Sequence, residues 1–106
     1  MRIYGLKNCD SCRKAKKALP GAELVELRET AVPDDLLHRA YAEFGDALIN
    51  TRSTTWRNLD EAARSLPPLA LIRAGPTVMK RPLIEVKDRL FLGWNKDIEQ
   101  EVHALL

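Results

Sequence analysis

The chain has 106 residues, of which 45% are hydrophobic and 30% are charged, and its formal net charge is +2. This length supports one domain with one modest hydrophobic core. The small net charge gives no reason to expect a nucleic-acid partner. No apolar run approaches the ~20 residues that a membrane-spanning helix needs, so we expect no membrane partner. Because a strand pattern begins at the second residue, we also expect no signal peptide and a cytoplasmic protein.

The first half of the chain alternates strand and helix patterns. Pro20 and Gly21 end the first helix, and Gly45 ends the second. The expected elements are a strand at 2–4, a helix at 11–19, a strand at 23–27, a helix at 33–44 and a short helix at 46–49.

The second half begins with helices and ends with a hairpin and a last helix. The expected elements are a polar loop at 50–55, helices at 56–66 and 69–74, strands at 83–86 and 89–92, and a helix at 97–106. We expect Thr54 and Thr55 to cap the helix at 56–66 and Asn95 to cap the last one. The element order predicts an α/β fold.

The most informative feature is a C-x-x-C motif formed by Cys9 and Cys12, where the first strand leads into the first helix. Cys9 therefore lies at a helix N-terminus, where unpaired N–H groups and the helix dipole favour a negative charge. We expect the pKa of Cys9 to fall below about 8.5, with Lys7, Arg13 and Lys14 acting in the same direction. Cys12 lies on the same helical face within disulfide reach, so the motif predicts a redox or thiol-transfer site.

Three other interpretations of the cysteines compete with this one. Cys12 can be a buried packing residue, since free cysteine behaves as a small hydrophobe. A structural disulfide is disfavoured because a chain without a secretory segment stays in a reducing compartment. Zinc is disfavoured because it wants four ligands, and His38 and His103 lie far from the cysteines in the sequence. We therefore expect no metal.

A C-x-x-C at the first strand–helix junction is typical of a thioredoxin-like fold. In such folds a proline directly before the third core strand is cis and lies against the active cysteine. Pro82 stands at that position. Because an X-Pro bond is cis in only about one case in twenty, the expectation of a cis Pro82 rests on the fold and not on the local sequence.

Three longer segments, at 4–15, 48–59 and 79–84, resemble the family of ArsC-type arsenate reductases, as does the closing Leu-Gly-Trp-Asn at 92–95. The chain is most similar to the YffB-like branch, whose members resemble glutathione-dependent thiol reductases. The resemblance implies one domain. Its thioredoxin-like core, a mixed sheet flanked by helices, would comprise residues of about 1–29 and 78–106, with a helical insertion at about 30–77 between the second and third core strands.

The resemblance places the family's catalytic cysteine at Cys9. Arsenate-reducing members hold the oxyanion with several arginines, and only Arg81 corresponds clearly to one of them. Asn50 stands where another should fall, and a third position falls near Gly93, close to Arg89. Arsenate carries at least one full charge and wants bidentate donors. The resemblance therefore implies glutathione and thiol chemistry ahead of the reduction of arsenate or a related oxyanion.

The expected reaction begins when the Cys9 thiolate attacks a disulfide or another oxidised acceptor. A mixed disulfide with glutathione, acting as co-substrate, follows. Cys12 or a second glutathione then resolves this intermediate, and Cys12 in particular allows an intramolecular disulfide.

Substrate binding is expected to use cations for the two carboxylates of glutathione. By the family resemblance, Lys7, Arg52 and Arg81 supply those cations, and Asn8 supplies a hydrogen bond. A cis Pro82 would expose the backbone groups of its neighbours to an extended ligand. We expect a monomer.

A second branch of the family gives an alternative of another class. Spx-like transcription regulators also carry an N-terminal C-x-x-C and an element like Thr51-Arg52-Ser53. Under this alternative the protein is a redox-switched regulator, with a Cys9–Cys12 disulfide as the switch and RNA polymerase as the partner.

Overall fold

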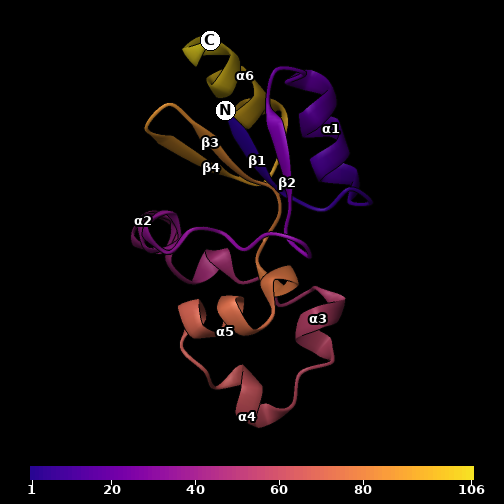
Figure 1. The fold of residues 1–106 in the computed structure, drawn as a ribbon, viewed down its shortest axis with the longest axis vertical. Coiled ribbons are helices and arrows are strands. Elements are labelled where there is room, and N and C mark those ends of the chain that lie inside the picture. The colour runs from indigo at the N-terminus through magenta and orange to yellow at the C-terminus, as the bar shows by residue number, and fades with distance from the viewer. The chain divides into compact units, whose positions relative to one another are not determined.

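The protein is described here by a computed structural model that covers all of residues 1–106. The chain divides into two compact units (Figure 1). Unit one comprises residues 1–30 and 81–106, and unit two comprises residues 31–80. That the two units make one domain, as the sequence suggests, stays a prediction. None of the helices combines the length and the apolar composition that crossing a bilayer requires.

Unit one is built on a four-stranded mixed sheet with the strand order β2-β1-β3-β4. β1 pairs with β2 in parallel and with β3 antiparallel, and β3 and β4 form an antiparallel hairpin. The strands are β1 (Arg2–Gly5), β2 (Glu23–Glu26), β3 (Leu83–Val86) and β4 (Arg89–Leu92). Both strands of the hairpin have the expected bounds, and Lys87 in its turn has a φ of 56°.

One row of apolar side chains crosses the sheet and faces its two helices. Leu24, Ile3, Ile84 and Phe91 are aligned in register across the four strands. Because side chains alternate between the faces of a strand, this row falls on one face of the sheet. Fully burying an aliphatic or aromatic side chain contributes about 1.5–3 kcal/mol, so this row makes a large contribution to the stability of unit one.

Two amphipathic helices cover that face (Figure 1). They are α1 (Asp10–Ala18) and α6 (Lys96–Leu105). α1 contributes Ala15, which is fully buried, and α6 contributes Val102, with Ile98 and Leu105 partly buried against the same cluster. Ile98, Val102 and Leu105 thus form the side of α6 that faces the core. The sheet and its helices thus form the expected thioredoxin-like core of an α/β protein.

Unit two is helical and lies in the sequence between the second and third strands. Its elements are α2 (Asp34–Phe44), the 3-10 turn η1 (Gly45–Leu48), α3 (Thr54–Arg57), α4 (Glu61–Arg64), α5 (Pro68–Ala74) and the 3-10 turn η2 (Pro76–Val78). α2 ends as expected at Gly45, whose φ of 59° is accessible to glycine at little cost.

The single helix expected at 56–66 is wrong, because the structure has two short helices there. Asn58 ends α3, and the Asp60 side chain then accepts a hydrogen bond of 2.8 Å from the Ala63 N–H and starts α4. The expected caps at Thr54 and Thr55 are also wrong. The Ser53 hydroxyl caps α3 by accepting from the Trp56 N–H at 3.1 Å. A Ser or Asp cap competes with helix continuation, which explains both differences.

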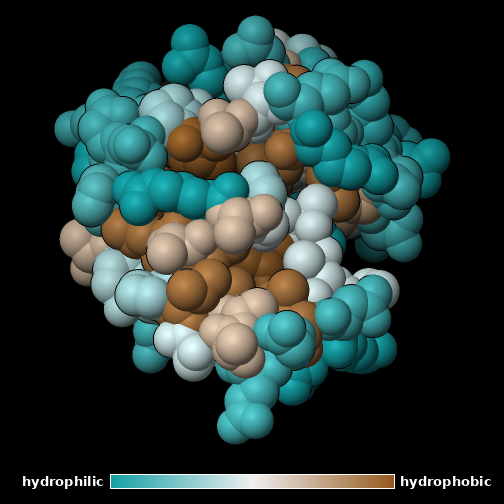
Figure 2. All heavy atoms as spheres, turned by 60° about the horizontal axis from the view of Figure 1, so that its bottom comes forward, coloured by the Kyte–Doolittle hydropathy of each residue, from teal (hydrophilic) through white to brown (hydrophobic).

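Unit two leaves an apolar hollow of about 190 Å³ at its surface. Its lining residues are Asp46, Ile49, Thr51, Trp56, Arg64, Leu66, Pro68 and Leu71. Leu66 remains 41% exposed. Figure 2 shows apolar atoms reaching the surface between hydrophilic side chains on the face it turns forward.

Replacing Asn95 tests the capping of α6. The Asn95 side chain accepts a hydrogen bond of 2.8 Å from the Ile98 N–H. Asn95→Ala leaves that donor unpaired and is expected to lower the free energy of unfolding by about 1 kcal/mol. Urea unfolding measures the change. Asn95→Asp keeps an acceptor and should unfold close to the wild type, and an equal loss in both variants would contradict the capping role.

Candidate active site

Cys9 is positioned by the turn that joins β1 to α1. It is the N-cap residue of α1, with extended backbone dihedrals, and its carbonyl accepts the Arg13 N–H at 2.9 Å. Its own N–H donates to the Leu6 carbonyl at 3.2 Å, which closes the turn. The side chain is partly exposed. The expected location of Cys9 at a helix N-terminus is confirmed, and the sulfur can meet a solvent-borne reactant.

Several donors converge on the Cys9 sulfur. Burial opposes ionisation and by itself raises the pKa of Cys9, but the backbone N–H and thiol of Cys12 and the guanidinium of Arg81 are near enough to favour the thiolate. Together with the charge of Arg81 they outweigh burial and lower the pKa of Cys9 from 9.0. The direction agrees with the sequence expectation. Arg81, which arrives through the fold, is the cation among the main causes of this shift.

Cys12 occupies the opposite kind of environment. It is 0% exposed, and its sulfur accepts a long hydrogen bond of 3.5 Å from the Leu6 N–H. Burial first, and the neighbouring Cys9 second, raise the pKa of Cys12 to about 12. Both cysteines are free thiols in the structure. Cys12 is therefore a buried packing residue, as one interpretation of the sequence held, and also a hydrogen-bond donor to Cys9.

Gly5 makes room for the buried thiol. A Cβ atom at Gly5 would collide with the Cys12 sulfur, and it would lie 3.1 Å from the Cys12 Cβ and 3.9 Å from the Pro82 Cβ. Only a residue without a side chain allows β1, α1 and Pro82 to approach this closely. The sequence analysis did not single out Gly5, although a glycine at the end of a strand next to C-x-x-C is a usable signal.

Pro82 lies in the same part of unit one. The Arg81–Pro82 peptide bond is cis, which confirms the expectation. The Pro82 carbonyl accepts a hydrogen bond of 2.8 Å from the Gly93 N–H. The structure thus brings Cys9, Cys12, Arg81 and Pro82 together at one site.

A buried carboxylate holds the loop that precedes Cys9. Glu26 is only 7% exposed, and its Oε2 accepts the Lys7 N–H at 2.8 Å while its Oε1 accepts the Arg28 Nε at 3.1 Å. Arg28 Nη2 in turn donates to Asn8 Oδ1 at 3.1 Å. Burial by itself raises the pKa of Glu26, but the hydrogen bonds from Lys7 and Arg28 outweigh it and lower the pKa below 4.5.

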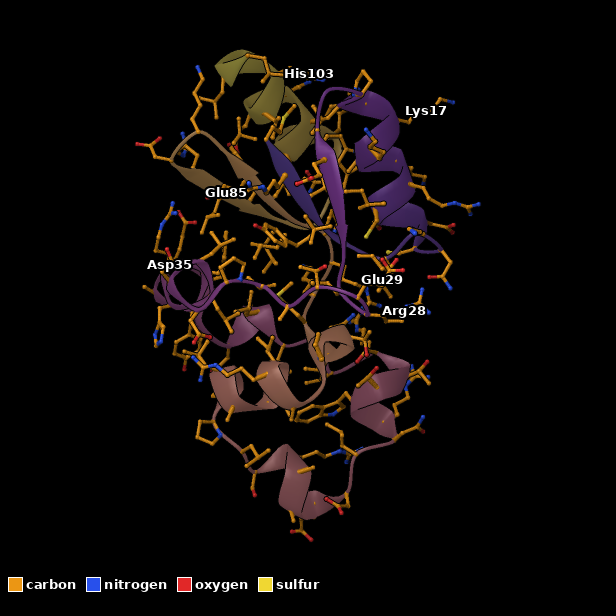
Figure 3. All side chains as sticks on the ribbon, in the orientation of Figure 1. Lys17, Arg28, Glu29, Asp35, Glu85 and His103 are labelled. Atoms are coloured by element: carbon orange, nitrogen blue, oxygen red, sulfur yellow. The ribbon has the colours of Figure 1, made fainter.

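Glu26 and Arg28 are functional-site residues that the sequence analysis missed. An acid at the end of a short apolar strand was the available signal, but one of its partners, Lys7, is 19 positions away along the chain. Lys7 and Asn8, expected to bind glutathione, are thereby fixed in place beside Cys9. The Lys7 ammonium lies 3.8 Å from Glu29 Oε1 with both side chains 68% exposed, so it remains accessible to a ligand. Figure 3 labels Arg28 and Glu29 just beyond β2.

Arg52 belongs to unit two. It lies in the turn before α3, where its N–H donates to Asn50 Oδ1 at 3.0 Å. Its expected role in binding glutathione stays a prediction. The structure contains no group of three or more His, Cys, Asp or Glu side chains that could hold a metal ion.

Comparison with known proteins places the chain in a family. The model of the ArsC family matches residues 4–102. The chain belongs to the ArsC family. An uncharacterized protein of Haemophilus influenzae is 36% identical over 111 residues, which cover 96% of this chain and 97% of that protein.

Both expected branches of the ArsC family are represented among its relatives. The global transcriptional regulator Spx of Listeria innocua is 32% identical, over 90% of this chain and 80% of the regulator. The solved structure of a YffB protein superposes with a TM-score of 0.83 at 29% identity, over 95% of this chain and 96% of that one. The resemblance stated from the sequence is confirmed, as is the thioredoxin-like fold of an ArsC-family thiol reductase.

The effect of the Arg81 charge on the pKa of Cys9 can be measured through the reactivity of Cys9. Arg81→Gln removes the cation next to the sulfur and is expected to raise the pKa of Cys9. The rate of alkylation by iodoacetamide as a function of pH reports that pKa. Arg13→Gln is the matched control, because Arg13 is near Cys9 in sequence but is not among the main causes of its lowered pKa. A larger shift in the control than in Arg81→Gln would contradict the assignment.

The buried carboxylate predicts a pH-dependent stability. Glu26→Gln is expected to lower the free energy of unfolding at pH 7 by about 1–3 kcal/mol, because charge-assisted hydrogen bonds are lost. The folded-state pKa of Glu26 is depressed, so its contribution is complete above 4.5 and is lost as pH falls through the lower folded value. The difference in free energy of unfolding between the wild type and Glu26→Gln should therefore become smaller in acid.

Chemical denaturation at pH 7 and at about pH 3 measures that gap. Glu29, whose side chain is exposed, provides the control, since Glu29→Gln should change the free energy of unfolding little at either pH. A gap for Glu26→Gln that is the same at both pH values would contradict the ionised, hydrogen-bonded carboxylate.

Proposed function

We propose that the protein is a glutathione-dependent thiol–disulfide oxidoreductase in which Cys9 is the nucleophile. The observation that carries the proposal is the set of donors around one partly exposed sulfur. The helix N-terminus, the Cys12 N–H and thiol, and the Arg81 guanidinium all favour its thiolate. A thiolate is the reactive form in disulfide exchange. Membership in the ArsC family supports the same chemistry.

The proposed cycle consists of two exchanges. The Cys9 thiolate attacks the glutathione sulfur of a substrate–glutathione disulfide, the S–S bond breaks, and the substrate leaves as a thiolate that takes up a proton. Glutathione now sits on Cys9 as a mixed disulfide. A second glutathione, as thiolate, attacks the sulfur of the bound one, which releases glutathione disulfide and restores the Cys9 thiolate. The substrate gains two electrons, and two glutathione molecules end as one disulfide.

The structure supports glutathione, rather than Cys12, as the resolving thiol. With a pKa of about 12, only about one Cys12 in 10⁵ is a thiolate at pH 7. Loss of the Cys9 charge in the mixed disulfide would remove one cause of this high value, but burial, the larger cause, remains. In the proposed cycle Cys12 donates its hydrogen bond to the Cys9 thiolate.

Arg81 gains a second use when the mixed disulfide forms. The thiolate charge that it stabilises disappears at that step, and its guanidinium then matches a carboxylate of glutathione, which is a strong bidentate acceptor. The exposed Lys7 ammonium is the proposed partner of the other carboxylate, with Arg52 as a further candidate. Asn8 keeps its amide N–H groups available, because Arg28 engages only its oxygen.

A redox-switched regulator is the second candidate. The identity with Spx of Listeria innocua favours it, as does the direct hydrogen bond between the Cys9 and Cys12 side chains. In that case oxidation would close a Cys9–Cys12 disulfide and alter binding to RNA polymerase. The two candidates differ in whether the chain turns over a disulfide substrate.

Serine substitutions separate the candidates. Under the proposed function Cys9→Ser abolishes the glutathione-dependent reduction of a small disulfide such as hydroxyethyl disulfide. Cys12→Ser retains most of the rate, because a serine hydroxyl still donates a hydrogen bond to Cys9. A coupled glutathione reductase assay measures both rates, and Cys12→Ala, which lacks the donor, should be slower than Cys12→Ser.

Two results would overturn the proposed function. If the wild-type protein shows no turnover with glutathione and any small disulfide, the regulator is favoured. If Cys12→Ser is as inactive as Cys9→Ser, Cys12 must be the resolving thiol and the assignment of resolution to glutathione is wrong.

A further inference from the structure

The helix that begins at Cys9 presents a basic face to solvent. Arg13, Lys14 and Lys17 are exposed, and their spacing puts them on one side of α1. The opposite side carries Cys12 and Ala15, which are fully buried. In Figure 3 the Lys17 side chain points away from the sheet. We call Arg13, Lys14 and Lys17 the basic face.

The charges of the basic face are little used within the chain. Arg13 Nη1 lies 4.0 Å from Asp10 Oδ1, and these side chains are 67% and 89% exposed, so this pair is weak. Lys14 and Lys17 form no ion pair. Lys16 differs, because its ammonium donates to the Pro20 and Ala22 carbonyls at 2.9 and 2.7 Å and so caps the end of α1.

The basic face extends further from Cys9 than glutathione reaches. Lys17 is eight residues beyond Cys9, which is about 12 Å along the helix axis. A tripeptide spans at most about 10 Å when extended. Because the sulfur of glutathione belongs to its middle residue, each arm reaches about half of that distance from Cys9. A ligand that covers Lys14 and Lys17 while its sulfur meets Cys9 must therefore be a longer chain.

We propose that the basic face docks an acidic polypeptide segment whose cysteine carries glutathione, so that the substrates are acidic protein–glutathione mixed disulfides. This inference rests on the proposed function and names its substrate class. The basic face begins next to Cys9, which in the proposed function reacts with disulfides. An acidic polypeptide is therefore favoured over a nucleic acid or a lipid surface, because of these three only a polypeptide can carry a disulfide.

The reaction follows the proposed cycle with the protein as leaving group. Cys9 attacks the glutathione sulfur, the bond to the protein sulfur breaks, and the protein thiolate departs and is protonated. A second glutathione then attacks the mixed disulfide on Cys9 and leaves as glutathione disulfide. The basic face does not take part in the chemistry. It raises the rate of encounter by electrostatic attraction, which salt screens over about 8 Å at physiological ionic strength.

Two synthetic peptides test the proposal. Both carry one glutathionylated cysteine in the same sequence, flanked by four glutamates in one peptide and by four glutamines in the other. The readout is the ratio of their second-order rate constants with the reduced protein. At low salt we expect the acidic peptide to react about tenfold faster, and the ratio to approach one as salt is added.

Charge-neutralising variants assign the effect to α1. Lys14→Gln/Lys17→Gln is expected to reduce the ratio several-fold. Lys87→Gln/Lys96→Gln removes the same charge at two exposed positions in the β3–β4 turn and at the start of α6, and should leave most of the ratio intact. An equal loss of the rate ratio in both double variants would show a general charge effect and would contradict the proposed docking role of the basic face.

Each remaining outcome is also decisive. If both peptides react at the same rate in low salt, the proposed docking role of the basic face is contradicted, while the proposed function stands. If neither peptide nor a small disulfide reacts, the proposed function itself fails. If a single-stranded oligonucleotide binds the wild type but not Lys14→Gln/Lys17→Gln, and the acidic peptide has no advantage, the basic face serves a nucleic acid instead.

Discussion

The sulfur of Cys9 and the donors around it are the interaction on which the rest of the site depends. Burial alone would raise the pKa of this thiol, and Cys12 and Arg81 outweigh burial and lower it. These groups come from α1 and from Arg81, two residues before β3, so the lowered pKa requires the folded unit one. The function proposed here follows from this local balance, since a thiol whose pKa is lowered ionises more readily and, at an accessible helix terminus, is a better nucleophile.

The two cysteines have different roles because the fold places them in different environments. Cys12 lies against Gly5 at the end of β1, where no other residue would leave room for its side chain. Its burial makes it a poor nucleophile and a fixed donor, while Cys9 one turn earlier meets solvent. A C-x-x-C motif with this asymmetry suits a cycle in which glutathione supplies the second thiol. The cations on the outer side of α1 then influence which disulfide substrates reach Cys9.

The sequence predicted the elements whose signals are local. Two short apolar runs on either side of the polar turn at Lys87 and Asp88 indicated the bounds of β3 and β4. Asn95 and the C-x-x-C marked the starts of α6 and α1. The break between α3 and α4 was missed because the capping signal at Asp60 was not considered. The Glu26 network could not be read from spacing, because it joins segments that meet only through the pairing of β1 with β2. The contact between Gly5 and Cys12 depends on how α1 folds back against β1. Arg81 was predicted at the site only through a family resemblance.

A pH titration of the two cysteines followed separately tests the central claim most directly. In protein labelled with ¹³C at the cysteine Cβ atoms, nuclear magnetic resonance resolves one titration curve for each thiol. The account predicts that Cys9 titrates below 9.0, while Cys12 stays protonated until about pH 12. Two curves with the same midpoint near 9.0, or a Cys12 that ionises before Cys9, would contradict it.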